Sequence, residues 1–172
     1  MFSFKSFTKC AALTLFFYLV WLVFYQFFLL PRTYFDEYLI HILVILSASV
    51  LYALGFTVSH NTAGFYHTLR IDDLGGVWIS PNCDGLSVVA VFVIVLISFP
   101  GDRKRLLYFV PIGAVIIELV NVFRIVCLSI VQRYYPTWLK FNHDYTFTII
   151  VYGMVIGLWW WWFTRYPKWK VR

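Results

Sequence analysis

The run LLYFVPIGAVIIELVNVFRIVCLSIV, from Leu106 to Val131, is long and apolar enough to cross a lipid bilayer as one α-helix. Glu118, Asn121 and Arg124 interrupt it at three-residue intervals. Residues three apart lie side by side on one helical face, so we expect a polar row within the membrane. Ionisable groups at this depth are costly unless they are paired or face a polar cavity, and they commonly mark a functional site. The run therefore predicts a membrane fold and also where its chemistry lies.

The composition of the whole chain points the same way. Of its 172 residues, 62% are hydrophobic and only 13% are charged, whereas a soluble domain has about 25% charged residues. The net charge of +6 indicates membrane topology and contact with lipid headgroups, and it does not indicate nucleic-acid binding. We predict an all-α, polytopic helical bundle that forms a single membrane-embedded domain over residues 1–172, with its catalytic core at 59–163.

Five apolar stretches predict about five membrane-spanning helices. The longest segment between them, at 59–82, contains TLRI and GGVWIS, which predict a short β-hairpin in an outer loop. The segment RYYPTWLKFNHD at 133–144 is typical of a loop, and the four tryptophans at 159–162 are typical of an aromatic belt at the membrane interface. The expected spans are residues 11–30, 38–58, 84–99, 106–131 and 145–163.

The distribution of Lys and Arg predicts which loops face the cytoplasm. With five spans, one face collects Arg32, Arg103, Lys104, Arg105, Arg165, Lys168, Lys170 and Arg172, and the other collects Lys5, Lys9, Arg70, Arg133 and Lys140. The positive-inside rule makes the first face cytoplasmic. The two termini then lie on opposite faces, unless the first span lies in the interface, which puts the N-terminus inside. Segments 59–82 and 133–144 face outward from the cell (inner, or cytoplasmic) membrane.

Three reactive side chains are expected to meet at that outer boundary. SPNCDGLSVV, at 80–89, places Cys83 at the mouth of one span, and His143 precedes another on the same side. Arg124 lies about two turns below the outer end of its helix, and its long side chain can reach the interface. A thiolate is a nucleophile, an imidazole can take and return its proton, and a guanidinium can stabilise an oxyanion. We therefore predict that Cys83, Arg124 and His143 are catalytic.

Four neighbours are expected to support this set, namely Gly85, Asn121, Asp84 and Asp144. Gly85 lets another backbone or a substrate approach closely. Asp84 can cap the helix that follows, although its charge otherwise disfavours a thiolate. Asn121 belongs to the polar row of the long span, and Asp144 follows His143 at the interface.

Other interpretations of the same residues stay open at this point. Glu118 or Asn121 could pair with Arg124 as a purely structural clamp, in a non-enzymatic scaffold or assembly factor of an export or exopolysaccharide system. The four histidines could serve a haem or quinone redox protein. A metal site at His41, His60 and His67 is not favoured because their spacing matches no known ligand motif, and we expect no cofactor. Cys10 and Cys127, in apolar surroundings, are expected to be small buried hydrophobes.

The motifs PNCDGLSVV, NVFRIV and HDYTFTIIVYG, in this order, resemble the exosortase/archaeosortase family over about Trp78 to Trp160. The resemblance implies a proposed catalytic set of Cys83, Arg124 and His143, with Gly85 and Asn121 in the matching motif positions. A histidine at the third position corresponds to the exosortase form, whereas the archaeosortase form has an arginine. The chain is shorter than many members, so it resembles a compact form that holds little beyond the catalytic core.

The same resemblance implies an activity and a class of partner. It implies a membrane cysteine protease or transpeptidase that acts on exported proteins. These substrates carry a C-terminal sorting signal, which consists of a short motif, an apolar helix and a basic tail. The enzyme would cleave near the motif through a cysteine thioester and pass the acyl group to an acceptor at the outer face.

Overall fold

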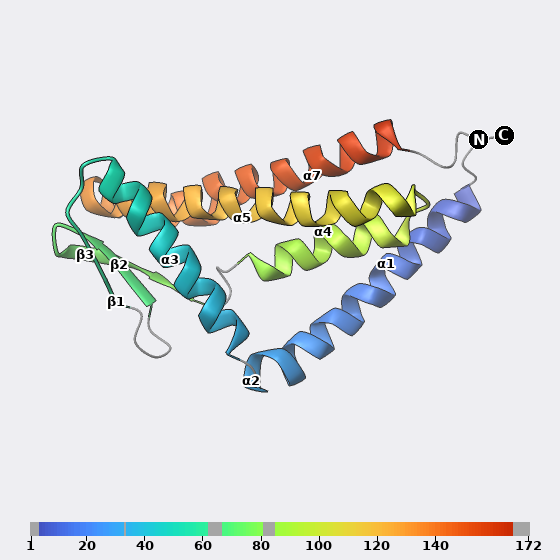
Figure 1. Ribbon diagram of the computed structural model, residues 1–172, viewed down its shortest axis with the longest axis horizontal. Helices are drawn as coiled ribbons and strands as arrows, with labels where there is room; N and C mark the ends of the chain where they lie inside the picture. Colours follow the sequence, from blue (N-terminus) through green and yellow to red (C-terminus); the bar gives the residue numbers. More distant parts are fainter. Residues whose placement is uncertain (1–3, 33, 62–66, 81–84, 167–172) are drawn as a thin grey trace.

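The computed structural model describes residues 4–32, 34–61, 67–80 and 85–166, and it is mostly helical with one small sheet (Figure 1). Two segments, η1 and η4, are π-helical, and η3 is a 3₁₀ turn. The elements are α1 (Phe4–Phe24), η1 (Tyr25–Leu29), α2 (Leu30–Arg32), α3 (Phe35–Ala53), β1 (Val58–Asn61), β2 (His67–Ile71), β3 (Leu74–Ile79), α4 (Leu86–Ser98), α5 (Arg103–Tyr134), η3 (Pro136–Trp138), α6 (Leu139–Phe141), η4 (Asn142–Thr146) and α7 (Phe147–Arg165).

Four helical stretches are long and apolar enough to cross a membrane, and a fifth apolar helix is shorter. The four are Ser6–Leu29, Phe35–Ala53, Arg103–Tyr134 and Pro136–Arg165. The fifth, α4, has 13 residues, which is about 20 Å of helix, against about 30 Å for the hydrocarbon core. The prediction of a polytopic helical membrane protein is therefore confirmed, with one helix that does not span the bilayer by itself.

The helices α4, α5 and α7 lie side by side along the long axis of the molecule (Figure 1). At one end, the turn between α4 and α5 leads into Arg103, Lys104 and Arg105, the first residues of α5. We call this the basic end. The opposite end carries the sheet, which packs with α3 against the last turns of α5. We call it the sheet end.

Both ends of the described chain lie at the basic end. The ring of Phe7, near the start of α1, is 6.0 Å from that of Phe99, which is 5.4 Å from that of Phe163, near the end of α7. After α1 has left the basic end, α3 does not return but continues toward the sheet end (Figure 1). The arrangement with the two ends of the chain on opposite faces is therefore wrong, and the described residues fit the alternative in which the N-terminus lies on the side of the C-terminus. Arg32, at the end of α2, also lies away from the basic end.

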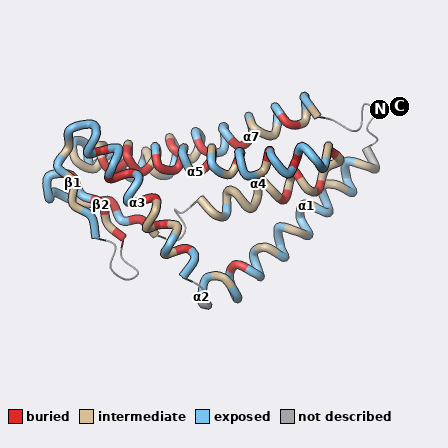
Figure 2. Tube along the Cα trace, viewed as in Figure 1, coloured by how far each residue is buried: buried red, intermediate tan, exposed pale blue. Residues whose placement is uncertain are grey.

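α3 takes this course because its buried apolar residues pack at the sheet end. Its residues Ile40, Leu43, Val44, Ala48 and Leu51 share one apolar core with strands β2 and β3 and with residues 122–128 of α5. A second core, toward the basic end, joins α4, α5 and α7 around Phe92, Ile117 and Trp162. Buried residues therefore run along α5 from one core to the other (Figure 2).

The sheet is a three-stranded antiparallel meander in the order β1-β2-β3. The predicted hairpin is confirmed as β2 and β3, but β1 occupies residues expected at the end of a span or in a loop. Asp72 and Asp73 connect β2 to β3, both with a φ of 54°, which is the left-handed conformation that two-residue hairpin turns require. Arg133, at the end of α5, donates from Nε to Asp72 Oδ2 at 3.1 Å and so ties the hairpin to the helix.

Two further expectations are corrected. Most of the predicted loop at 133–144 is helical, and η3, α6 and η4 lead directly into α7. The segment is held against the bundle because Leu139 packs against the sheet-end core. The tryptophan run is only partly an exposed belt. Trp160 and Trp161 are exposed, but Trp162 is buried and stacks on Phe109 with ring centroids 4.9 Å apart.

The contact between α4 and α5 generates a stability prediction. A Cβ on Gly113 of α5 would lie 2.3 Å from the ring of Phe92, which is fully buried and has no room to move. We expect Gly113→Ala to lower the free energy of unfolding by about 1–3 kcal/mol, as overpacking does, despite the better helix propensity of alanine.

The matched control is Gly153→Ala in α7, where a Cβ would meet nothing within 4 Å. Thermal unfolding of the two purified variants in the same detergent measures the difference. Equal melting temperatures for both would show that α4 and α5 do not approach as closely as described.

Candidate functional site

Arg124 and His143 form the centre of the candidate site. A guanidinium nitrogen of Arg124 lies 3.0 Å from Nε2 of His143, and Nδ1 of His143 lies 2.9 Å from Oδ1 of Asp144. Arginine has no acceptor, so Nε2 must accept from Arg124. The proton of the neutral imidazole then sits on Nδ1 and is donated to Asp144. The three side chains form a connected row from half-buried Arg124 to exposed Asp144.

The local fold holds His143 toward α5. His143 lies in η4, whose wider π-helical turns shift the side chains relative to a regular α-helix, and such turns are frequent at functional sites. The hydroxyl of Thr148 donates to the carbonyl of His143 at 3.2 Å, and the side-chain amide of Asn142 donates to the carbonyl of Trp138 at 3.0 Å. These two bonds satisfy backbone acceptors around the irregular segment.

Gly85, the residue that precedes α4, lies against the polar row of α5. A Cβ on Gly85 would lie 2.7 and 2.9 Å from the carboxylate oxygens of Glu118 and 3.0 Å from the amide nitrogen of Asn121. Gly85 also has a φ of 81°, a left-handed conformation that costs other L-residues about 1–2 kcal/mol. Glycine is therefore favoured over other residues at this position for two independent reasons, the close contact and the backbone conformation.

The start of α4 explains why polar groups occur in the middle of α5. Glu118 is 16 residues from the end of α5 at Tyr134, or about 24 Å along the helix. Gly85, the residue before α4, thus lies at the depth of Glu118, well below the end of α5. Irregular backbone at membrane depth is tolerated only where protein or a polar cavity surrounds it. Glu118 and Asn121 supply such polar surroundings beside Gly85.

The sequence-predicted residues fall into two described groups. Arg124, His143 and Asp144 come together, and so do Gly85 and Asn121. Cys83 and Asp84 lie outside the described residues. The described ion pairs do not include the Glu118–Arg124 form of the structural clamp, and Arg124 bonds to His143 instead. The Asn121–Arg124 form stays open. The place of Glu118 beside Gly85 follows from tertiary packing that its spacing does not reveal.

A comparison with protein-family models now adds to this geometry. The model described as Transmembrane exosortase (EpsH) matches residues 5–163, nearly the whole chain. The chain belongs to the transmembrane exosortase family. The comparison with curated proteins found no match, and neither did the comparison with solved structures. For this exosortase, the match covers α1 as well as the segment in which the three motifs lie, and it identifies a multi-pass membrane protein of a family generally considered peptidases or transpeptidases.

Gly85→Ala tests the contact between the start of α4 and the exosortase's polar row. The new methyl group would displace the Glu118 carboxylate in addition to straining the backbone. We therefore expect activity on a family substrate to fall at least tenfold, which corresponds to a rise of about 1.4 kcal/mol or more in the activation free energy.

Gly55→Ala is the matched control, because Gly55 has a φ of 90° but nothing within 4 Å of its Cβ position. Both variants carry the backbone strain, and only Gly85→Ala disturbs the site. Equal activities, measured as substrate processing per amount of inserted protein, would contradict the assignment.

Proposed function

We propose that this exosortase cleaves the C-terminal sorting signal of exported proteins and transfers them to an acceptor through a thioester on Cys83. The observation that carries the proposal is the bond between Arg124 and Nε2 of His143, one helical turn from the point where Gly85 meets Asn121. A cation and a basic nitrogen are thus held together at the side of α5 that receives the chain leading into α4.

Chain connectivity supports Cys83 as the nucleophile. Cys83 is two residues before Gly85, and two residues of extended chain span at most about 7 Å. Arg124 is three residues from Asn121 on α5, which is about 4.5 Å along the helix axis. A thiol, a guanidinium and an imidazole can therefore share one substrate carbonyl.

The hydrogen-bond row suggests an order of events. Nε2 of His143 already accepts from Arg124, so it can take the thiol proton only after Arg124 has moved away. A substrate carbonyl provides the reason, because its developing oxyanion attracts the guanidinium. Nε2 then receives the proton of Cys83 while sulfur attacks the carbonyl carbon, and Asp144 stabilises the imidazolium through Nδ1–H.

The second half of the reaction returns the proton. The imidazolium gives it to the leaving amine as the C–N bond breaks, and a thioester remains on Cys83. A neutral amine or water then attacks the thioester, the C–S bond breaks, and the proton of the attacking group passes through His143 to the sulfur. This gives an amide or an acid and restores the thiol.

We place the sheet end on the outer side of the cell membrane. Lys9 in α1, the Arg103–Arg105 cluster and Arg165 of α7 all belong to the basic end, and the positive-inside rule makes that end cytoplasmic. The substrate helix would then cross the bilayer beside the bundle with its basic tail inside. Its cleavage motif would lie near Arg124.

Three substitutions test the catalytic assignment. Cys83→Ala is expected to abolish processing of a tagged substrate, because no other group can form the thioester. His143→Ala is expected to lower the rate by about 10²–10⁴-fold, as loss of a general acid–base does. Arg124→Ala is expected to lower it by about 10²–10³-fold, as loss of an oxyanion donor does.

The matched controls are Cys127→Ala and His60→Ala, which remove the same groups from outside the site. Each variant is assayed for membrane insertion and thermal stability alongside processing. Normal processing by Cys83→Ala would refute the assignment of Cys83 as the nucleophile. If the wild-type protein inserts into the membrane but processes no sorting-signal substrate, the result would favour a scaffold.

A further inference from the structure

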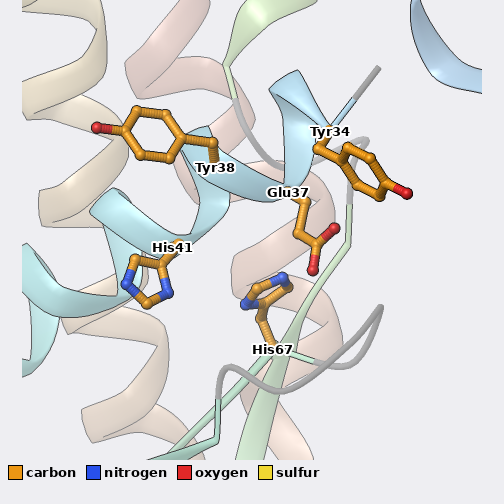
Figure 3. A pocket seen from close by; sticks show the side chains of 5 residues that line it. All are labelled: Tyr34, Glu37, Tyr38, His41 and His67. Atoms are coloured by element: carbon orange, nitrogen blue, oxygen red, sulfur yellow. The ribbon is translucent and has the colours of Figure 1, made fainter. Parts of the chain in front are cut away.

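A polar pocket lies between the start of α3 and the start of β2, and neither Arg124 nor His143 is among its described lining. It has a volume of about 240 Å³ and is lined by Tyr34, Glu37, Tyr38, His41 and His67 (Figure 3). The side chains of Glu37 and His67 lie next to each other in this view, with Tyr34 on one side and His41 and, farther out, Tyr38 on the other (Figure 3). Nothing in the proposed peptidase chemistry uses these residues.

His67 is the feature that marks the pocket as a binding site. The residue is only 2% exposed, and neither ring nitrogen has a hydrogen-bond partner among the described residues. Buried polar groups are normally satisfied, because an unpaired one costs about 1–3 kcal/mol. Burial lowers the pKa of His67, and the Glu37 carboxylate opposes this effect only in part. The imidazole is therefore neutral near pH 7, with one nitrogen free to accept a hydrogen bond.

The rest of the lining favours a cation. Glu37 takes part in none of the ion pairs among the described residues, and neither Lys nor Arg is among the described lining. The exposed rings of Tyr34 and Tyr38 offer π faces, which attract cations. The pocket thus has one carboxylate, the imidazoles of His41 and His67 and two phenol rings, in a chain with a net charge of +6.

A metal ion does not suit this set. No group of three or more His, Cys, Asp or Glu side chains in the described part of the chain is arranged to hold one. An organic cation needs no such convergence, since an ammonium group donates three hydrogen bonds in separate directions. We propose that the pocket binds a protonated primary amine, with Glu37 as its counter-ion, His67 as a hydrogen-bond acceptor and the tyrosine rings as walls.

The position of the pocket connects it to the cysteine segment. His67 pairs with Ile79 in the register of β2 and β3, and Ile79 lies four residues before Cys83 in the sequence. A bound amine would thus sit on the strand pair that leads into this segment. Its occupancy does not depend on whether Cys83 is a nucleophile, so the two proposals can fail separately.

Ligand-observed saturation-transfer NMR on the purified full chain tests the proposal, with ethanolamine as the probe. Ethylene glycol is the neutral control, because it has the same length but carries no charge. We expect saturation transfer to ethanolamine and not to ethylene glycol. In Glu37→Gln, binding is expected to be about tenfold weaker, as loss of a charge-assisted hydrogen bond predicts.

Asp73→Asn is the matched control, since it removes an exposed carboxylate from the β2–β3 turn and should leave binding unchanged. Tyr38→Leu, at an exposed position that tolerates substitution, should weaken binding without affecting the fold. Equal signals from the two probes, or an ethanolamine affinity that Glu37→Gln leaves unchanged, would overturn the proposal.

Lipid nanodiscs distinguish the source of the amine. If a lipid headgroup fills the pocket, phosphatidylethanolamine in the discs will suppress the ethanolamine signal relative to discs of phosphatidylcholine alone. If the natural ligand is a soluble amine, the two kinds of disc will give the same signal. Either result supports an amine site, provided that the signal depends on Glu37.

Discussion

The bond from the Arg124 guanidinium to Nε2 of His143 is the interaction on which the site depends. A lone guanidinium within a membrane helix is costly, so α5 requires a partner at this depth, and η4 supplies one at 3.0 Å. On its other side, His143 lies 2.9 Å from Asp144. The Arg124–His143 bond therefore ties α5 to the segment that leads into α7, and in the mechanism that we propose it is also the contact that Arg124 leaves when a substrate carbonyl arrives.

The short helix α4 is the second constraint. A helix of 13 residues cannot cross the hydrocarbon core alone, and Gly85, just before it, is non-helical and lies beside the middle of α5. Non-helical backbone at this depth requires polar neighbours, which accounts for Glu118 and Asn121 beside Gly85. Two requirements at successive turns of α5 thus explain the polar row that breaks its apolar run. Glu118 and Asn121 surround Gly85, and Arg124 pairs with His143.

Much of the fold and part of the candidate site could be predicted from the sequence. Apolar length predicted the helices, turn residues predicted the β2–β3 hairpin, and three-residue spacing placed Asn121 and Arg124 on one face. The course of α1 and α3 was missed, because counts of basic residues constrain which side a loop faces but do not reveal that α3 packs at the sheet end. The pocket around Glu37 and His67 was missed for a similar reason. Residues 30 apart in the sequence meet there only because the sheet folds back onto α3. An acidic residue in the first turn of an apolar span was the available signal.

The central claim is that Cys83 meets the Arg124–His143 pair, and proximity cross-linking measures this directly. In a background with Cys10→Ser and Cys127→Ser, the variant His143→Cys has two thiols, at positions 83 and 143. A short bis-maleimide should join them within one chain, as seen by intact mass. The control variant Thr164→Cys, with its second thiol near the basic end, should not cross-link. If both thiols of His143→Cys react singly and no intrachain product forms, the account of the site is wrong.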